Sequence, residues 1–147
     1  MRSNRVGHGP TFHDQIDPAP QRHVAVMSGR EVIQQFHHCA HIAVALTYLA
    51  EAPVDDATVR MRQTLQKFTQ RHGVNVYHET VTRFWMKLLD HLATTHYRDM
   101  PLWRRINLIV ERWAVTDPIA AHYSHSVISS RAARESWIAP DRLPLPF

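Results

Sequence analysis

Apolar residues recur at intervals of three and four between residues 28 and 52, and this spacing predicts one long amphipathic helix. Ser28 and Glu31 form a capping box at its start, in which each side chain satisfies a free backbone amide. Pro53 marks its end, because proline cannot continue a helix. The stripe expected to face inward is Val32, Phe36, Cys39, Ala43, Leu46 and Ala50.

The same periodicity predicts three further helices. Asp55 or Asp56 is expected to cap the second helix, which ends at His72 with Gly73 as its stop signal. A third helix covers roughly residues 76–96, and Asp99 with Pro101 opens the fourth. The residues expected to face inward are Met61, Leu65 and Phe68 in the second helix, His78, Thr82, Trp85, Leu89 and Leu92 in the third, and Leu102, Ile106, Ile109 and Trp113 in the fourth.

The two ends of the chain lack the long helical periodicity of its middle. A short helix is expected near residues 118–124, and Ser129 or Ser130 caps another that runs to about Trp137. Residues 1–27 are rich in proline and read as a flexible arm, and residues 139–147 read as an extended tail. The prediction is an all-α domain at 28–138, a bundle of four main helices with two short C-terminal ones.

Composition limits the classes of function. The 147 residues suffice for one core, and the single cysteine, Cys39, cannot form an internal disulfide. With no leader pattern at the start, a cytoplasmic protein is expected. The net charge of +4 is spread over solvated helix faces, so neither a nucleic acid nor a membrane is expected as a partner. A homo-oligomer is compatible with the sequence.

Histidine is the outlier, at 12 residues. On a helical wheel, His38 and His41 share a second face of the first helix and lie one turn apart, so their rings can converge. His78 heads the inward stripe of the third helix. Three neutral imidazoles with an open position suit catalytic zinc, or iron or copper where oxygen chemistry is involved. The alternative is that each ring is bonded to a backbone carbonyl and only supports the fold.

Several other polar residues are candidates for the same site. Glu79 would complete a facial triad with two histidines, or else it favours the helix N-terminus and pairs with Arg83. Thr82 either orients His78 or bonds back to its own helix. Tyr123 is a candidate proton donor. The expected substrate contacts are Arg83, Ser124 and Tyr48.

Three stretches also resemble a known group of sequences: FHHCAHIAVALTYL at 36–49, YHETVTRFW at 77–85, and HYS…SRAARESWIAPDRLPLP at 122–146. They are similar to small bacterial all-helical proteins with F-x-H-x-x-H, YHE-T-x-T-R-F-W and W-x-x-P-D patterns and no assigned activity. The likeness begins at Arg30 and leaves His37 outside the pattern. It implies that the shared polar positions are His38, His41, His78, Glu79, Thr82, Arg83, Tyr123 and Ser124.

The combined prediction is a small enzyme with a histidine-rich pocket between the first and third helices. His38, His41, His78 and Glu79 would bind a divalent metal, zinc or iron, while His78, Tyr123 and Thr82 would be catalytic. The substrate is a small polar or anionic molecule, and the reaction is hydrolytic, dehydrating or oxidative. The alternatives are a non-catalytic accessory or binding protein with structural histidines, and a haem protein with one axial histidine.

Overall fold

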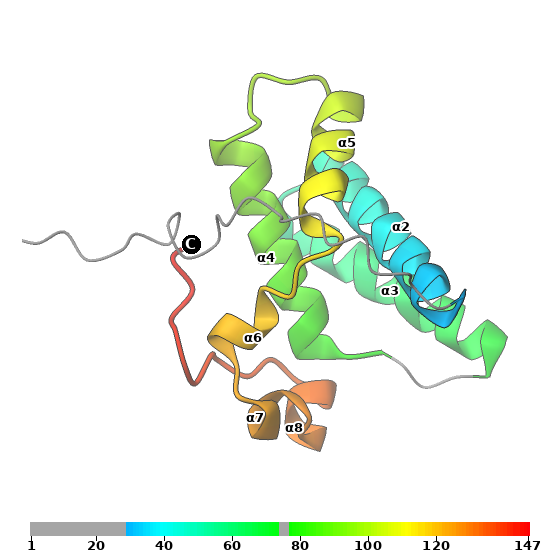
Figure 1. Ribbon diagram of the computed structural model, residues 1–147, viewed down its shortest axis with the longest axis vertical. Helices are drawn as coiled ribbons and strands as arrows, with labels where there is room; N and C mark the ends of the chain where they lie inside the picture. Colours follow the sequence, from blue (N-terminus) through cyan, green and yellow to red (C-terminus); the bar gives the residue numbers. More distant parts are fainter. Residues whose placement is uncertain (1–28, 74–76) are drawn as a thin grey trace, which may run out of the picture.

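The computed structural model describes residues 29–73 and 77–147, with side chains from His37 onward (Figure 1). This part of the chain is all-helical, as predicted. Its four long helices are α2 (Gly29–Glu51), α3 (Val54–His72), α4 (Glu79–Thr95) and α5 (Leu102–Trp113). The predicted arm at 1–27 and the capping box of Ser28 and Glu31 lie outside the described residues and side chains.

The core lies where α2, α3, α4 and α5 meet. Helix α2 packs against α3, α4 and α5, and α4 also contacts α3 and the short helix α8 (Arg131–Glu135). No helix in the described ranges is long and apolar enough to cross a membrane. The buried apolar side chains that join the four long helices are Ile42, Ala45, Leu46, Ala57, Met61, Phe84, Met86, Leu88, Leu89, Leu92, Ala93, Ile109 and Trp113.

The predicted inward stripe of α2 is partly wrong. Leu46 is buried, but Ala50 is exposed and Cys39 is only half-buried, whereas Ile42 and Ala45 are in the core. Because α2 has helices on three sides, it buries a broad face rather than a narrow stripe. The small alanines at several positions made two stripes look equivalent in the sequence.

The helix ends follow local chemistry. Helix α2 ends at Glu51, and α3 ends at His72 before Gly73, whose φ of 63° is the left-handed conformation that glycine adopts without strain. The start of α3 differs from the prediction: Pro53 occupies the N-cap, and Asp55 and Asp56 lie in the first turn. Carboxylates there are stabilised by the positive end of the helix dipole without bonding as caps.

Helix α4 begins three residues later than predicted, at Glu79, because His78 occupies the N-cap in an extended conformation. Helix α5 begins after Pro101, as expected, with Ile109 and Trp113 buried. Phe68, predicted to face inward from α3, is 40% exposed.

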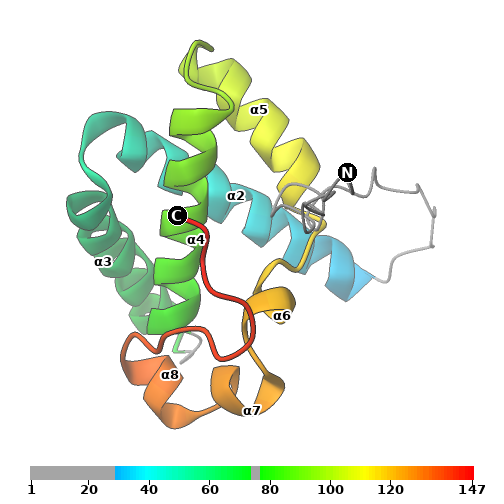
Figure 2. The same cartoon turned by 90° about the vertical axis from the view of Figure 1, so that its left-hand side faces the viewer.

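The C-terminal part holds three short helices instead of two. They are α6 (Ile119–His122), α7 (His125–Ile128) and α8, and Ser124 and Ser130 cap the last two. We call residues 118–147 the C-terminal segment. Beyond α8 the chain is extended and runs back along α4, where the ring of Phe147 stacks on His91 with centroids 5.0 Å apart (Figure 2).

Candidate functional site

A cavity of about 120 Å³ lies between α2, α3 and α4. Its polar wall is formed by His38 and His41 from α2 and by Thr82 from α4. Here the structure brings together three of the residues singled out in the sequence. The rest of the lining is apolar: Ile42, Ala45, Met61, Leu65, Val81, Trp85, Met86 and Leu89. The space is therefore an apolar recess with a few hydrogen-bonding groups at one side.

The two imidazoles form no hydrogen bond with any described residue. The ring of His38 meets the ring of Trp85 edge to face, with centroids 4.8 Å apart. Burial lowers the pKa of His38 below 6.5, partly opposed by Asp117. Partial burial also lowers the pKa of His41, with His38 and His37 adding to the shift, although the residue as a whole is exposed to solvent. A pKa below 6.5 favours the neutral form of both rings at pH 7, in which one ring nitrogen carries a lone pair.

A second recess of about 150 Å³ adjoins the first and shares part of its wall. His41 and Thr82 line both spaces, as do Leu65 and Val81. The second recess also reaches His78 and Tyr77. His41 and Thr82 are thus the polar groups common to both recesses.

His78 has a role in the fold. Its Nδ1 accepts a hydrogen bond from the amide of Val81 at 3.3 Å, and its Nε2 lies 2.8 Å from the carbonyl oxygen of Ile128. The Nε2 must carry the proton, because a carbonyl oxygen can only accept. Both nitrogens are thus engaged, one in capping α4 and one in holding the C-terminal segment. This geometry supports a structural role rather than the predicted role of metal ligand or proton carrier.

Glu79 does not pair with Arg83 as the sequence spacing indicated. Two nitrogens of Arg62, on α3, donate to its carboxylate oxygens at 2.9 and 2.5 Å, and the hydroxyl of Tyr77 donates to the same group. Burial alone would raise the pKa of Glu79, but these hydrogen bonds outweigh it and hold the pKa below 4.5. Burial and the bond to Glu79 raise the pKa of Tyr77 to about 12.

The remaining predicted site residues lie elsewhere. The hydroxyl of Tyr123 donates to the carbonyl of Ile138 at 2.8 Å, and burial raises its pKa to about 12, with Asp141 adding to the shift. Ser124 caps α7. Tyr48 bonds Thr64 at 2.9 Å under the guanidinium of Arg60. These side chains do not line either recess.

Thr80 and His122 continue the same pattern of ties to the C-terminal segment. The hydroxyl of Thr80 donates to the carbonyl of Ser136 at 2.7 Å and accepts from the amide of Ile138 at 3.1 Å. The Nδ1 of His122 lies 2.8 Å from the carbonyl oxygen of Leu143. Polar side chains of α4 and α6 thus bond backbone groups of residues 136–143, which follow α8 and have no regular structure of their own.

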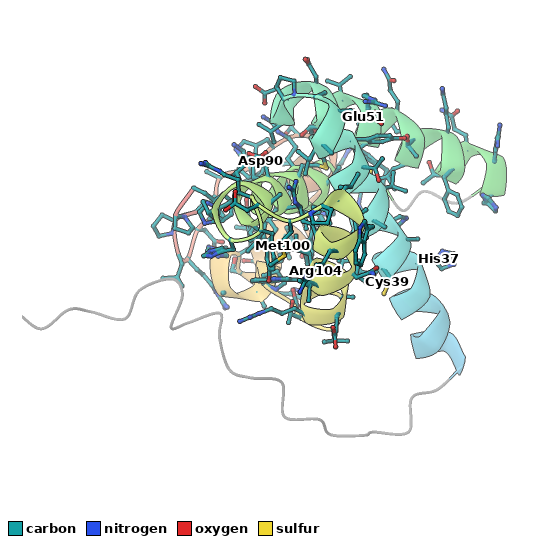
Figure 3. The ribbon with its side chains drawn as sticks, turned by 90° about the horizontal axis from the view of Figure 1, so that it is seen from above. His37, Cys39, Glu51, Asp90, Met100 and Arg104 are labelled. Atoms are coloured by element: carbon teal, nitrogen blue, oxygen red, sulfur yellow. The ribbon has the colours of Figure 1, made fainter. Side chains whose placement is uncertain are left out.

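The other members of the histidine-rich stretch lie outside the recess. Figure 3 shows the His37 ring projecting from α2 at the outer edge of the molecule, and the residue is exposed. Cys39 is a half-buried free thiol. Among residues 29–73 and 77–147, no three His, Cys, Asp or Glu side chains come together as a set that could hold a metal ion.

Sequence reasoning missed Arg62, Tyr77 and Trp137, which surround Glu79 and Arg83. Arg62 was interpreted as part of a solvated basic face of α3. A buried acid in the first turn of α4 is a signal that a cation from another helix must lie near it, but the sequence does not say which one.

Comparisons with protein-family models, with curated proteins and with solved structures find no match to this chain. The resemblance to small bacterial helical proteins therefore stays a prediction.

Proposed function

We propose that this chain is a small enzyme that binds a compact, mostly apolar molecule between α2, α3 and α4 and moves a proton with His41. The observation that carries the proposal is that the His41 imidazole, whose pKa is lowered and which bonds no described residue, lines both recesses together with the hydroxyl of Thr82. A neutral imidazole is a general base whose pKa suits work near neutral pH. His38, one turn away, supplies a second acceptor or donor.

The size and lining of the recesses define the ligand. Apolar cavities of about 150 Å³ hold molecules the size of benzene, and the two adjoining recesses measure about 120 and 150 Å³. The walls are aliphatic and aromatic apart from the histidines and threonines. The ligand is thus expected to have an apolar body of ring size and one polar group that meets His38 or His41.

The first test measures binding. Phenol and toluene have nearly the same shape, but only phenol can donate a hydrogen bond to a neutral imidazole. Titration by calorimetry or protein NMR should show phenol binding more tightly than toluene, by about tenfold if one hydrogen bond is made. The difference should shrink in His41→Gln and His38→Gln, and remain in His125→Gln, an exposed histidine of α7. Equal affinity for the two probes in the unaltered chain would refute the proposed contact.

The second test measures proton removal. A nitro-substituted benzisoxazole opens its ring once a base removes one proton, and the phenolate product is coloured. The rate should rise with pH through the lowered pKa of His41 and then level off, because only the neutral ring is a base. We expect His41→Gln to lose at least about tenfold of the rate. An unchanged rate in both His41→Gln and His38→Gln would rule out the base.

A metal would act in the same place but needs more ligands than the described residues supply there. Catalytic zinc sites use three protein ligands and keep one open position, whereas His38 and His41 supply two. We therefore favour a metal-free site. Zinc that remains bound in equimolar amount after dialysis, and is lost in both His38→Gln and His41→Gln, would reverse this choice.

The rival proposal, a non-catalytic accessory protein with structural histidines, is favoured by His78 and His122, whose rings bond backbone carbonyls. It predicts that the unaltered chain opens the benzisoxazole ring no faster than the His41→Gln variant does. The cytoplasmic location expected from the sequence stays a prediction.

A further inference from the structure

A cleft of about 560 Å³ lies between α3, α4 and α8, and Tyr77 lines both this cleft and the second recess. Its lining is charged rather than apolar, unlike that of the two recesses. Its charged and aromatic lining residues include Arg62, Tyr77, Glu79, Arg83, Arg134 and Trp137.

One wall of the cleft is fixed and electrically balanced. Arg62 holds the carboxylate of Glu79 through two nitrogens, with Tyr77 as a third donor. A two-pronged arginine–carboxylate pair of this kind is rigid as well as strong. The negative charge of Glu79 is thus already compensated and does not repel an incoming anion as a bare carboxylate would.

The lining also holds two further cations, Arg83 and Arg134, and the charge of Arg83 contributes to the lowered pKa of Glu79. The guanidinium carbon of Arg83 lies 5.4 Å from the centre of the Trp137 ring, which holds it in place through a cation–π contact. Within the described ranges, neither Arg83 nor Arg134 forms a side-chain hydrogen bond or an ion pair. Their N–H groups are therefore available to a ligand.

The net charge of the lining residues favours an anionic ligand. Three arginines and two glutamates line the cleft. Arg62 compensates Glu79, and Arg131, outside the lining, compensates Glu135 at 2.7 Å. Two positive charges are left, on Arg83 and Arg134. A phosphate monoester carries about −1.5 to −2 at pH 7, and its oxygens match the fork of N–H donors on a guanidinium.

We propose that this cleft binds a small organic phosphate, with its phosphate group between Arg83 and Arg134 and its organic part beside Trp137. A cleft of about 560 Å³ has room for a phosphate and a ring. The site is separate from the cavity of His38 and His41, and it stands or falls independently of the proposed enzyme activity.

The test is a titration of the full chain with phenyl phosphate, followed by calorimetry or phosphorus NMR at pH 7. Arg83→Gln and Arg134→Gln should each weaken binding at least about tenfold, because each removes charged donors to the phosphate. Arg104→Gln, an exposed position on α5, makes the same change in net charge and should leave the affinity within about twofold. His41→Gln should bind phenyl phosphate like the unaltered chain.

Several outcomes would overturn the proposal. They are unchanged affinity in both Arg83→Gln and Arg134→Gln, an equal loss in Arg104→Gln, and tighter binding of succinate than of phenyl phosphate. If Arg83→Gln does not fold, Arg134→Gln decides alone, since Arg134 is exposed on α8 and its removal leaves the core untouched. Inorganic phosphate should bind more weakly than phenyl phosphate, and the reverse would remove Trp137 from the site.

Discussion

The two pocket histidines of α2 differ in their surroundings from His78, at the start of α4, and from His122, within the C-terminal segment. His78 and His122 each place a ring nitrogen 2.8 Å from a backbone carbonyl oxygen of that segment. His38 and His41 instead line an apolar recess and form no hydrogen bond with described residues. The first pair helps to hold the C-terminal segment in place, whereas no described residue bonds the ring nitrogens of the second pair.

The difference arises from what the nearby backbone lacks. In the middle of α2, where His38 and His41 lie, the carbonyls and amides are paired within the helix, so a histidine there has no backbone group to satisfy. The C-terminal segment has short helices and an extended tail, whose carbonyls need donors from elsewhere. Adjacent hydroxyls show the same division: Thr80 bonds the segment twice, whereas Thr82, two residues on, faces the recess.

The largest effect on stability should come from removing the two hydrogen bonds of the Thr80 hydroxyl. Thr80→Val keeps the shape but leaves the carbonyl of Ser136 and the amide of Ile138 without partners inside the protein. An unpaired group at the half-buried Ile138 costs about 1–3 kcal/mol, and a lost hydrogen bond at the exposed Ser136 costs about 0.5–1.5 kcal/mol. We therefore expect a loss of about 2–4 kcal/mol in the free energy of unfolding, measured by urea denaturation.

The matched control is Thr94→Val at the exposed end of α4, where the hydroxyl bonds back to Asp90 in its own helix. Its effect should stay within about 0.5 kcal/mol. A small effect at both threonines would mean that the C-terminal segment is not held by α4.

The second-largest effect should appear when one histidine of each pair is replaced by alanine, because the two variants should lose different amounts of unfolding free energy. His78→Ala removes the cap of α4 and the bond to Ile128, which we expect to cost about 1–3 kcal/mol of unfolding free energy. His78→Asn restores a cap and should recover part of it. His41→Ala removes no hydrogen bond to a described residue and should cost about 0.5 kcal/mol or less. If thermal and urea unfolding show equal losses at both positions, the contrast between the pairs disappears.

The fold was predictable because apolar residues recur at helical spacing in the four long helices, and because Pro53, Gly73 and Pro101 mark helix ends. These signals are local. The rotation of α2 was not predictable, since Ala43, Ala45 and Ala50 fit a core face and an exposed face equally well, and only the neighbours α3, α4 and α5 decide.

The candidate site was predictable only in part. The convergence of His38 and His41 follows from their spacing of three on one helix. The role of His78 depends on a carbonyl fifty residues later in the chain, at Ile128, and the partner of Glu79 lies on another helix at Arg62. Such long-range pairs leave no periodic trace in one sequence, so a histidine that caps a helix and one that lines a recess cannot be told apart there.

The smallest effect, and the sharpest contrast, should appear as pH is lowered. The pKa values of His38 and His41 lie below 6.5 in the folded chain, so below pH 6.5 the unfolded chain binds more protons and the free energy of unfolding falls with falling pH. Glu79 adds its own loss only below pH 4.5, because its folded pKa is also lowered. Ring-proton NMR should give both histidine pKa values directly, and the slope of stability between pH 6.5 and 4.5 should diminish in a chain carrying His38→Gln and His41→Gln. A slope that persists unchanged in that double variant would place the titrating groups elsewhere and remove the evidence that burial in the recess keeps these two rings neutral.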